Sequence, residues 1–192
     1  SGQGSYLTAE QLAKVDAVSR DLGLWGLDAP EEVGGMNLPM VAMVGVNEEL
    51  GRTATPYTLP PDSPNLRMMM VAADERQREA YLAPYVRGET ISAIGISEPG
   101  AGADPAQMKT TAVQDGDDWV INGRKAFITG AQGAKVGIIM AKANEGACMF
   151  LVDLPDPAIR IEHVPNTIDN SMPGGHATVL IDNLRVPADQ ML

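Results

Sequence analysis

The segment with the clearest chemical potential is a glycine-rich turn at residues 97–104, Ser-Glu-Pro-Gly-Ala-Gly-Ala-Asp, which follows an apolar run. Glycines let main-chain N–H groups approach an anion closely, so such a turn could hold a phosphate group. It is not a Walker loop, because no Gly-Lys-Ser/Thr follows, and Pro105 replaces the third glycine of the dinucleotide fingerprint. From spacing alone, a structural corner is the commoner explanation. We expect Glu98 and Asp104 to be solvated, structural carboxylates rather than an acid–base pair.

The remaining reactive residue types are few and scattered. His163, His176 and Cys148 have no spacing that suggests catalysis, and a single cysteine excludes an internal disulfide and a cysteine-based metal cluster. We therefore expect no metal site, and the cysteine content fits the reducing cytoplasm. A net charge of -11 disfavours nucleic acid and anionic lipid as partners. No apolar run approaches the ~20 residues that a membrane-spanning helix needs.

Two halves with different periodicity must position the turn. Residues 5–90 read as a helical domain, in which Thr8 with Gln11 and Asp74 with Gln77 have capping-box spacing. Residues 91–192 consist of short β-branched runs without helical segments between them. Asp-Gly at 115–116 and Asn-Gly at 122–123 predict tight hairpins. The predicted fold class is α+β, with helices first and an antiparallel β-barrel or sandwich second.

Several motifs, in order, resemble the acyl-CoA dehydrogenase family. Residues 97–104 resemble its Thr/Ser-Glu-Pro-x-Ala-Gly-Ser-Asp signature, and residues 120–129, Val-Ile-Asn-Gly-Arg-Lys-Ala-Phe-Ile-Thr, resemble its Asn-Gly-x-Lys-x-Trp-Ile-Thr motif. Residues 183–192 are similar to the tail of its β-domain, and residues 25–36 and 48–51 match its helical domain. The resemblance covers almost the whole chain. It implies an incomplete N-terminal helical domain and a middle β-domain, without the C-terminal helical domain.

The resemblance implies that FAD lies along the β-domain. It assigns the cofactor-binding positions to Ile96, Ser97, Gly102, Ala103, Phe127, Ile128 and Thr129. Ser97 would donate a hydrogen bond to a flavin carbonyl, and Gly102 would approach the pyrophosphate. Ala103 stands where the family usually has serine, and the missing hydroxyl would weaken binding by about 0.5–1.5 kcal/mol. Without the family, a serine that bonds its own turn is the simpler interpretation of Ser97.

Two further assignments concern the flavin ring itself. Phe127 replaces the family's usual tryptophan, and its ring could pack on the isoalloxazine while lacking the indole N–H. The alternative is a core aromatic that follows strand alternation, flanked by Ala126 and Ile128. Thr129 would place its hydroxyl near flavin N5, which receives hydride, and so tune the cofactor. The alternative is an ordinary β-branched strand residue.

The family's reaction is α,β-dehydrogenation of an acyl-CoA thioester, in which a glutamate removes the α-proton. That glutamate lies in the C-terminal domain of most members, so we expect no catalytic residue in this chain. The chain alone should be inactive, with weak or no FAD binding. The parent enzyme would pass electrons to an electron-transfer flavoprotein and form a homo-oligomer. The alternatives are a related flavin oxidase or monooxygenase, such as a nitroalkane oxidase, and a non-catalytic FAD-binding subunit of a split enzyme.

Overall fold

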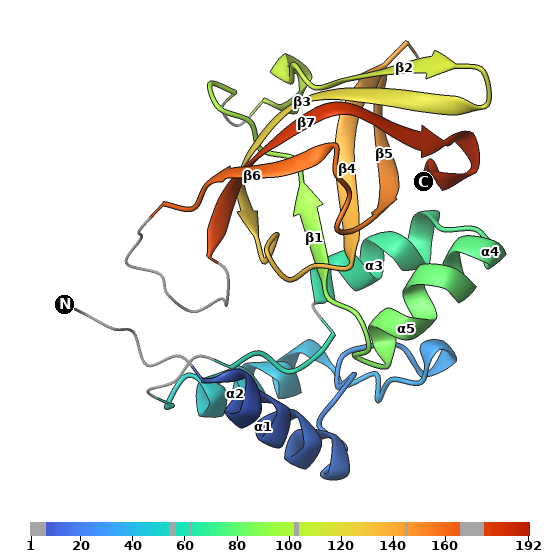
Figure 1. Cartoon of the computed structure of the whole chain (residues 1–192). Coiled ribbons are helices and arrows are strands. Elements are labelled where there is room, and N and C mark those ends of the chain that lie inside the picture. The colour runs from blue at the N-terminus through green and yellow to red at the C-terminus, as the bar shows by residue number, and fades with distance from the viewer. Residues whose placement is uncertain (1–6, 54–56, 62, 102–103, 145, 166–174) are drawn as a thin grey trace.

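The chain forms a group of helices followed by a curled sheet, as the computed structural model in Figure 1 shows. The model describes residues 7–53, 57–61, 63–101, 104–144, 146–165 and 175–192. The α-helices are α1 Ala9–Asp21, α2 Met40–Leu50, α3 Ser63–Ala72, α4 Glu75–Gln77 and α5 Ala83–Val86. A π-helical segment, η2, spans Arg78–Leu82, and short 3₁₀ segments span η1 Glu31–Val33, η3 Pro105–Gln107 and η4 Ala188–Gln190. The strands are β1 Ser92–Gly95, β2 Thr111–Asp115, β3 Asp118–Thr129, β4 Val136–Ala143, β5 Gly146–Asp153, β6 Ile159–His163 and β7 His176–Pro187. The predicted α+β fold class is confirmed.

Both capping boxes expected from the sequence are present. The Thr8 hydroxyl accepts from the Gln11 amide at 3.3 Å, while the Gln11 side chain accepts from the Thr8 amide at 2.8 Å. Asp74 and Gln77 exchange the same pair of bonds at 2.7 and 3.0 Å. Each box satisfies amides that the first turn of a helix leaves without partners. Polar residues at fixed spacing therefore set where these helices begin.

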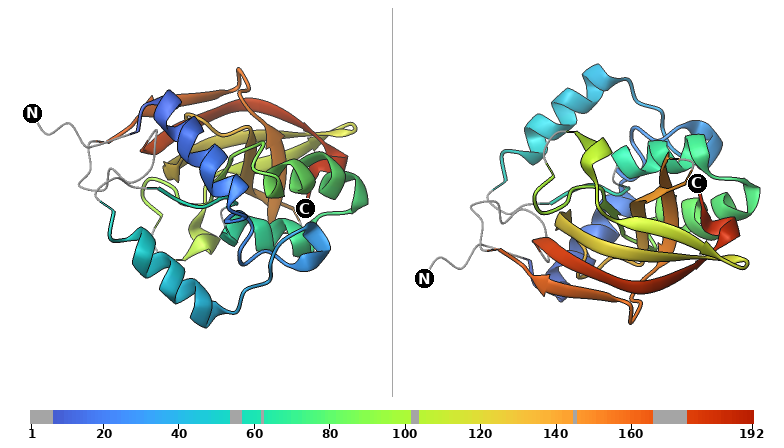
Figure 2. Two further views of the ribbon diagram at one scale, coloured as in Figure 1. Left: turned by 90° about the horizontal axis from the view of Figure 1, so that it is seen from below. Right: turned by 90° about the horizontal axis from the view of Figure 1, so that it is seen from above.

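The later helices pack against the sheet, whereas α1 and α2 lie farther from it. Residues of α3 and of the segment 75–86 pack against β4 and β5 in one apolar cluster, with Leu66, Met69, Tyr85, Ile138 and Leu151 among its buried members. Figure 1 shows α3 and α5 below the sheet, with α1 and α2 farther from it, and Figure 2 shows the same arrangement from below and from above. The sequence of α2 is strongly apolar, yet none of its residues is buried. The sheet is therefore anchored to the later helices.

The sheet is a mixed, seven-stranded half-barrel. Its strand order is β1-β4-β2-β3-β7-β6, and β5 pairs with the same β4 off this path. Most pairings are antiparallel, as expected, but β1 runs parallel to β4, so the sheet is not wholly antiparallel. The concave side encloses a core that includes Trp119, Ile121, Phe150, Ile181 and Leu184. The β3–β7 ladder joins the two 12-residue strands of the sheet.

One of the two predicted hairpins is instead a continuous stretch of β3 that lies opposite a bulge in β7. Asp115 pairs with Asp118 across a tight turn, so the Asp-Gly prediction at 115–116 is confirmed. The Asn-Gly prediction at 122–123 is wrong, because β3 continues through it with a register shift against β7. A Cβ atom on Gly123 would lie 2.3 Å from Thr110 Oγ1, so glycine is required by close packing and not by a turn.

Truncation of Phe150, within this core, should destabilise the protein strongly. Its side chain is fully buried, and its ring lies 5.6 Å from the Trp119 ring at a 60° tilt. Phe150→Ala should lower the free energy of unfolding by about 3–5 kcal/mol, because it removes buried surface and leaves a cavity. Urea denaturation followed by tryptophan fluorescence measures this change. Val113→Ala, at an exposed site in β2, is the control, and a Phe150→Ala loss no larger than the control's would contradict this core.

Candidate functional site

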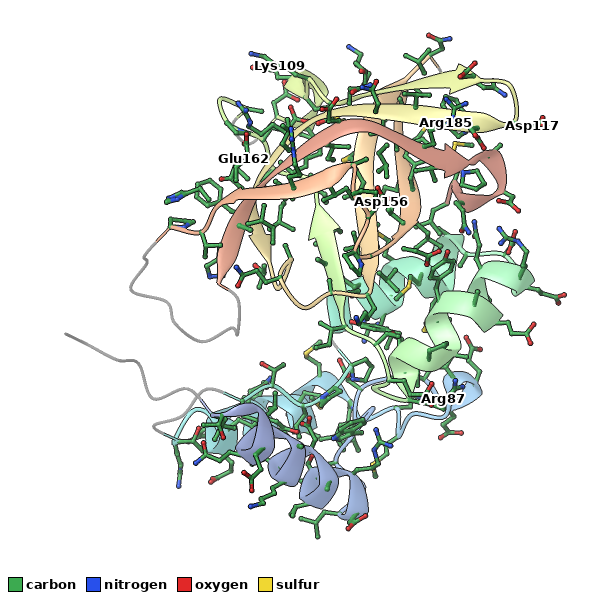
Figure 3. The ribbon with its side chains drawn as sticks, viewed as in Figure 1. Arg87, Lys109, Asp117, Asp156, Glu162 and Arg185 are labelled. Carbon is green, nitrogen blue, oxygen red and sulfur yellow. The ribbon has the colours of Figure 1, made fainter. Side chains whose placement is uncertain are left out.

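The loop after β1 contains a buried carboxylate. Glu98 accepts hydrogen bonds from the main-chain amides of Lys109 at 2.6 Å and Thr110 at 3.0 Å, and from Lys125 Nζ at 2.8 Å. Figure 3 shows Lys109 at the top of the sheet, where β2 begins. The expectation that Glu98 is solvated is therefore wrong, because three donors compensate for its loss of water. Asp104 is exposed, as expected, and accepts from the Ala106 amide at 3.0 Å.

Lys125 is the most deeply buried charged side chain described. Its side chain is 0% exposed and that of Glu98 is 4% exposed, and Nζ also donates to the Ile96 carbonyl at 3.2 Å. Burial alone would raise the pKa of Glu98, but hydrogen bonds from Lys125, Lys109 and Thr110 lower it to about 2. Burial lowers the pKa of Lys125, and Glu98 opposes that effect. The carboxylate is therefore ionised at neutral pH and is a poor general base.

A bulge in β3 directly follows Lys125. Lys125 pairs with Val179 and Ile128 pairs with Ala177, so Ala126 and Phe127 both lie opposite one residue of β7. Phe127 has φ of 60°, a left-handed conformation that a residue with a Cβ rarely adopts. Its side chain is consequently directed outward and is 69% exposed. The alternative of a core aromatic is therefore wrong, because the bulge breaks the strand alternation on which it depended.

A main-chain hydrogen bond joins the bulge to the loop. The Ala126 amide donates to the Ser97 carbonyl at 2.9 Å. Ser97 is exposed and Ile96 is half-buried, so the loop and the exposed Phe127 meet at one place on the surface. Two segments 30 residues apart in the sequence thus form one site.

The end of β3 completes this region. The side chain of Ile128 is buried in the core, so only its main chain can serve a site on the outer surface. Thr129 is half-buried, and its Oγ1 lies 2.9 Å from Nδ1 of His176, the first residue of β7. Sequence reasoning found no spacing around His176 that suggests catalysis, and only the pairing of Thr129 with His176 across β3 and β7 reveals the contact. Gly102 and Ala103 lie outside the described residues.

Two hollows occur elsewhere in the described structure. A cavity of about 260 Å³ lies inside the half-barrel, lined mainly by apolar residues including Ile128, Ile139 and Val179. Asp156, labelled in Figure 3, lies on its rim. A wider groove of about 760 Å³ separates α1 from α2, with Val18 and Leu50 in its walls. Ser97, Phe127 and Thr129 line neither hollow, so the candidate site is a surface of the sheet.

The searched, described part of the chain offers neither a metal site nor a membrane span. It contains no group of three or more His, Cys, Asp or Glu side chains that could bind a metal ion. None of its helices combines the length and apolar character required to cross a bilayer. An exposed aromatic ring beside a hydroxyl-bearing loop is suited to binding a flat organic group and not to acid–base catalysis by itself.

Relatives of known name share most of this chain. It is 33% identical over 193 residues to (R)-benzylsuccinyl-CoA dehydrogenase of Thauera aromatica, covering 94% of this chain and 47% of that protein. It is 31% identical over 179 residues to the human mitochondrial short-chain specific acyl-CoA dehydrogenase, covering 89% of this chain and 43% of that protein. The chain therefore spans about half the length of the curated relatives it matches.

Solved structures agree with the sequence relatives. A Mycobacterium abscessus structure assigned to the acyl-CoA dehydrogenases superposes with a TM-score of 0.85 and 31% identity, over 97% of this chain and 49% of that one. A glutaryl-CoA dehydrogenase from Mycobacterium smegmatis in complex with FADH2 shares the fold, with a TM-score of 0.79 and 24% identity, over 97% and 47% of the two chains.

The family models divide the chain into two consecutive parts. Residues 6–89 match the acyl-CoA dehydrogenase N-terminal domain, and residues 93–180 match the acyl-CoA dehydrogenase middle domain. Together with the relatives, these matches show that the chain belongs to the acyl-CoA dehydrogenase family.

Proposed function

We propose that this chain is part of an FAD-dependent acyl-CoA dehydrogenase that forms an α,β double bond in an acyl-CoA thioester. The observation that carries the proposal is Phe127, an exposed ring at a strained main-chain position, joined through its bulge to the Ser97 loop. An exposed aromatic in an unfavourable conformation indicates a binding role, because folding alone gains little from it. The named activities of the relatives support an oxidoreductase acting on acyl-CoA.

The residues present fit a flavin along this surface. The flat ring of Phe127 would pack against the isoalloxazine and exclude water, and the Ser97 hydroxyl would donate to a flavin carbonyl. The Thr129 hydroxyl, oriented by His176, would lie near N5. The main chain at Ile96 and Ile128 would border the ring. Of the two positions outside the described residues, the resemblance implies that Gly102 would approach the pyrophosphate and that Ala103 would lack one hydroxyl contact to the cofactor. When bound, FAD would supply the hydride acceptor for the reaction.

The catalytic base belongs, in this proposal, to the part of the enzyme that has no counterpart in this chain. Glu98 is unsuited to that role, because Lys125 and two amides hold it ionised with a pKa of about 2. We propose that the parent enzyme is a cytoplasmic homo-oligomer that passes electrons to an electron-transfer flavoprotein. The fold it shares with a structure holding FADH2 supports the choice of cofactor.

The first prediction concerns the isolated chain. The 192-residue protein should bind FAD only weakly, so that after mixing with excess FAD and gel filtration it retains little flavin absorbance, because weakly bound FAD dissociates on the column. It should not reduce a ferricenium acceptor with any of a panel of acyl-CoA thioesters, from short-chain to aryl-substituted, because this proposal assigns the catalytic base to another part of the enzyme. Turnover of any of these thioesters would contradict the assignment of the base to another part of the enzyme.

The second prediction concerns the aromatic ring. Phe127→Gly should weaken FAD binding about two- to tenfold, the range expected from loss of one aromatic contact. Its free energy of unfolding should change by less than about 1 kcal/mol, because relief of the positive φ offsets the greater freedom of glycine. Equilibrium dialysis at high protein concentration measures the first effect and urea denaturation the second. Val113→Ala is the control, and unchanged FAD binding in Phe127→Gly would exclude the proposed ring contact.

A further inference from the structure

The Glu98–Lys125 pair joins three segments of chain that border the candidate site. Glu98 belongs to the loop after β1, its two amide donors precede β2, and Lys125 lies in β3. Lys125 Nζ also donates to the Ile96 carbonyl, which belongs to the same loop two residues before Glu98. The hydrogen bonds to this carboxylate therefore tie the loop after β1 to the segment before β2 and to β3.

Such a pair is not explained by stability alone. Moving two charges out of water is unfavourable, and replacing a buried pair with well-packed neutral groups often leaves stability unchanged. What the ionic pair supplies is a fixed geometry, since the carboxylate accepts its donors only in defined directions. Its effect should therefore appear in the arrangement of neighbouring groups.

The neighbouring groups are the ones that need support. Ala126 and Phe127 follow Lys125 immediately, and Phe127 has a φ of 60°. Residues persist in such conformations only where the surroundings restrict the main chain from several sides. Here the restraints are the ion pair on one side of the bulge and the Ala126 amide to Ser97 carbonyl bond within it.

We propose that Glu98 and Lys125 are positioning residues of the cofactor site, which fix the Ser97 loop and the Phe127 ring relative to each other. Neither side chain reaches the surface, so both act through Ser97 and Phe127. This inference rests on the proposed function for the identity of the ligand. The geometric part, a loop and a bulge held together by the pair, stands without any ligand.

The test is a neutral replacement of both partners, Glu98→Gln with Lys125→Met, which leaves no unpaired buried charge. The Ala126 amide should exchange with solvent about tenfold faster, as expected when a buried hydrogen bond loses its support. The FAD dissociation constant from equilibrium dialysis should rise about tenfold, with the melting temperature changed by only a few degrees. Hydrogen exchange is measured by NMR without FAD.

The matched control replaces the neighbouring exposed pair, Arg124→Met with Glu162→Gln. This pair also involves β3 and has an N–O distance of 2.7 Å, but it lies on the outer surface, where Figure 3 shows Glu162. Exchange at Ala126 and FAD binding should both be unchanged in this variant. An equal effect in the two double variants would overturn the proposal, since the loss of any ion pair near β3 would then be enough to speed Ala126 exchange and weaken FAD binding.

Each of the remaining outcomes also tests the proposal. Unchanged Ala126 exchange in the Glu98→Gln, Lys125→Met protein would show that the pair does not hold the bulge. Faster exchange with unchanged FAD affinity would show that it does not position the cofactor site. If that variant does not fold, hydrogen exchange in the wild type tests the proposal instead. An Ala126 amide that exchanges as fast as an exposed loop amide would show that the main chain of the bulge is not held in place. Absence of FAD binding by the wild type in equilibrium dialysis, with protected Ala126, would instead contradict the proposed flavin site on this chain and leave the restraint on the bulge in place.

Discussion

A carboxylate and an ammonium group, both withdrawn from water, meet at 2.8 Å between Glu98 and Lys125, and the arrangement of the candidate site follows from that contact. Removing one partner would leave an uncompensated charge in the core, which costs about 3–5 kcal/mol in comparable proteins. The loop after β1 and the strand β3 are consequently tied together. The strained conformation of Phe127 is tolerated where those two segments meet.

The pairing of β3 with β7 is interrupted by two bulges, and each affects the candidate site or the residues next to it. At the first, two residues of β7 lie opposite Asn122, and the absence of a side chain on the adjacent Gly123 admits Thr110 closely. At Ala126 and Phe127, the extra residue turns an aromatic side chain from the core to the surface. The helices contribute at the other side of the sheet, where α3 and the segment that follows it pack against β4 and β5. A rigid sheet thus presents a small surface site.

Local polar patterns and periodicity were enough to predict the fold class, both capping boxes and the Asp-Gly hairpin. They failed at Asn122-Gly123 because this pair lies within β3, opposite a bulge in β7, and only the pairing with that strand shows it. Glu98 was misjudged because its three donors come from 11 to 27 residues farther along the chain. His176 was missed for the same reason, since its contact with Thr129 spans 47 residues. The roles proposed for Ser97, Phe127 and Thr129 come from the family resemblance, because spacing alone does not suggest them.

The most direct test of the central claim uses the two phenylalanines as internal reporters. Only Phe127 and Phe150 occur in the chain, one exposed and one fully buried, so protein labelled with 4-fluorophenylalanine should give two ¹⁹F NMR signals. Titration with FAD should shift the Phe127 signal through the ring current of the isoalloxazine and leave the Phe150 signal in place, even if binding is weak. A titration in which neither signal moves, or in which both move equally, would contradict a flavin site at the Phe127 bulge.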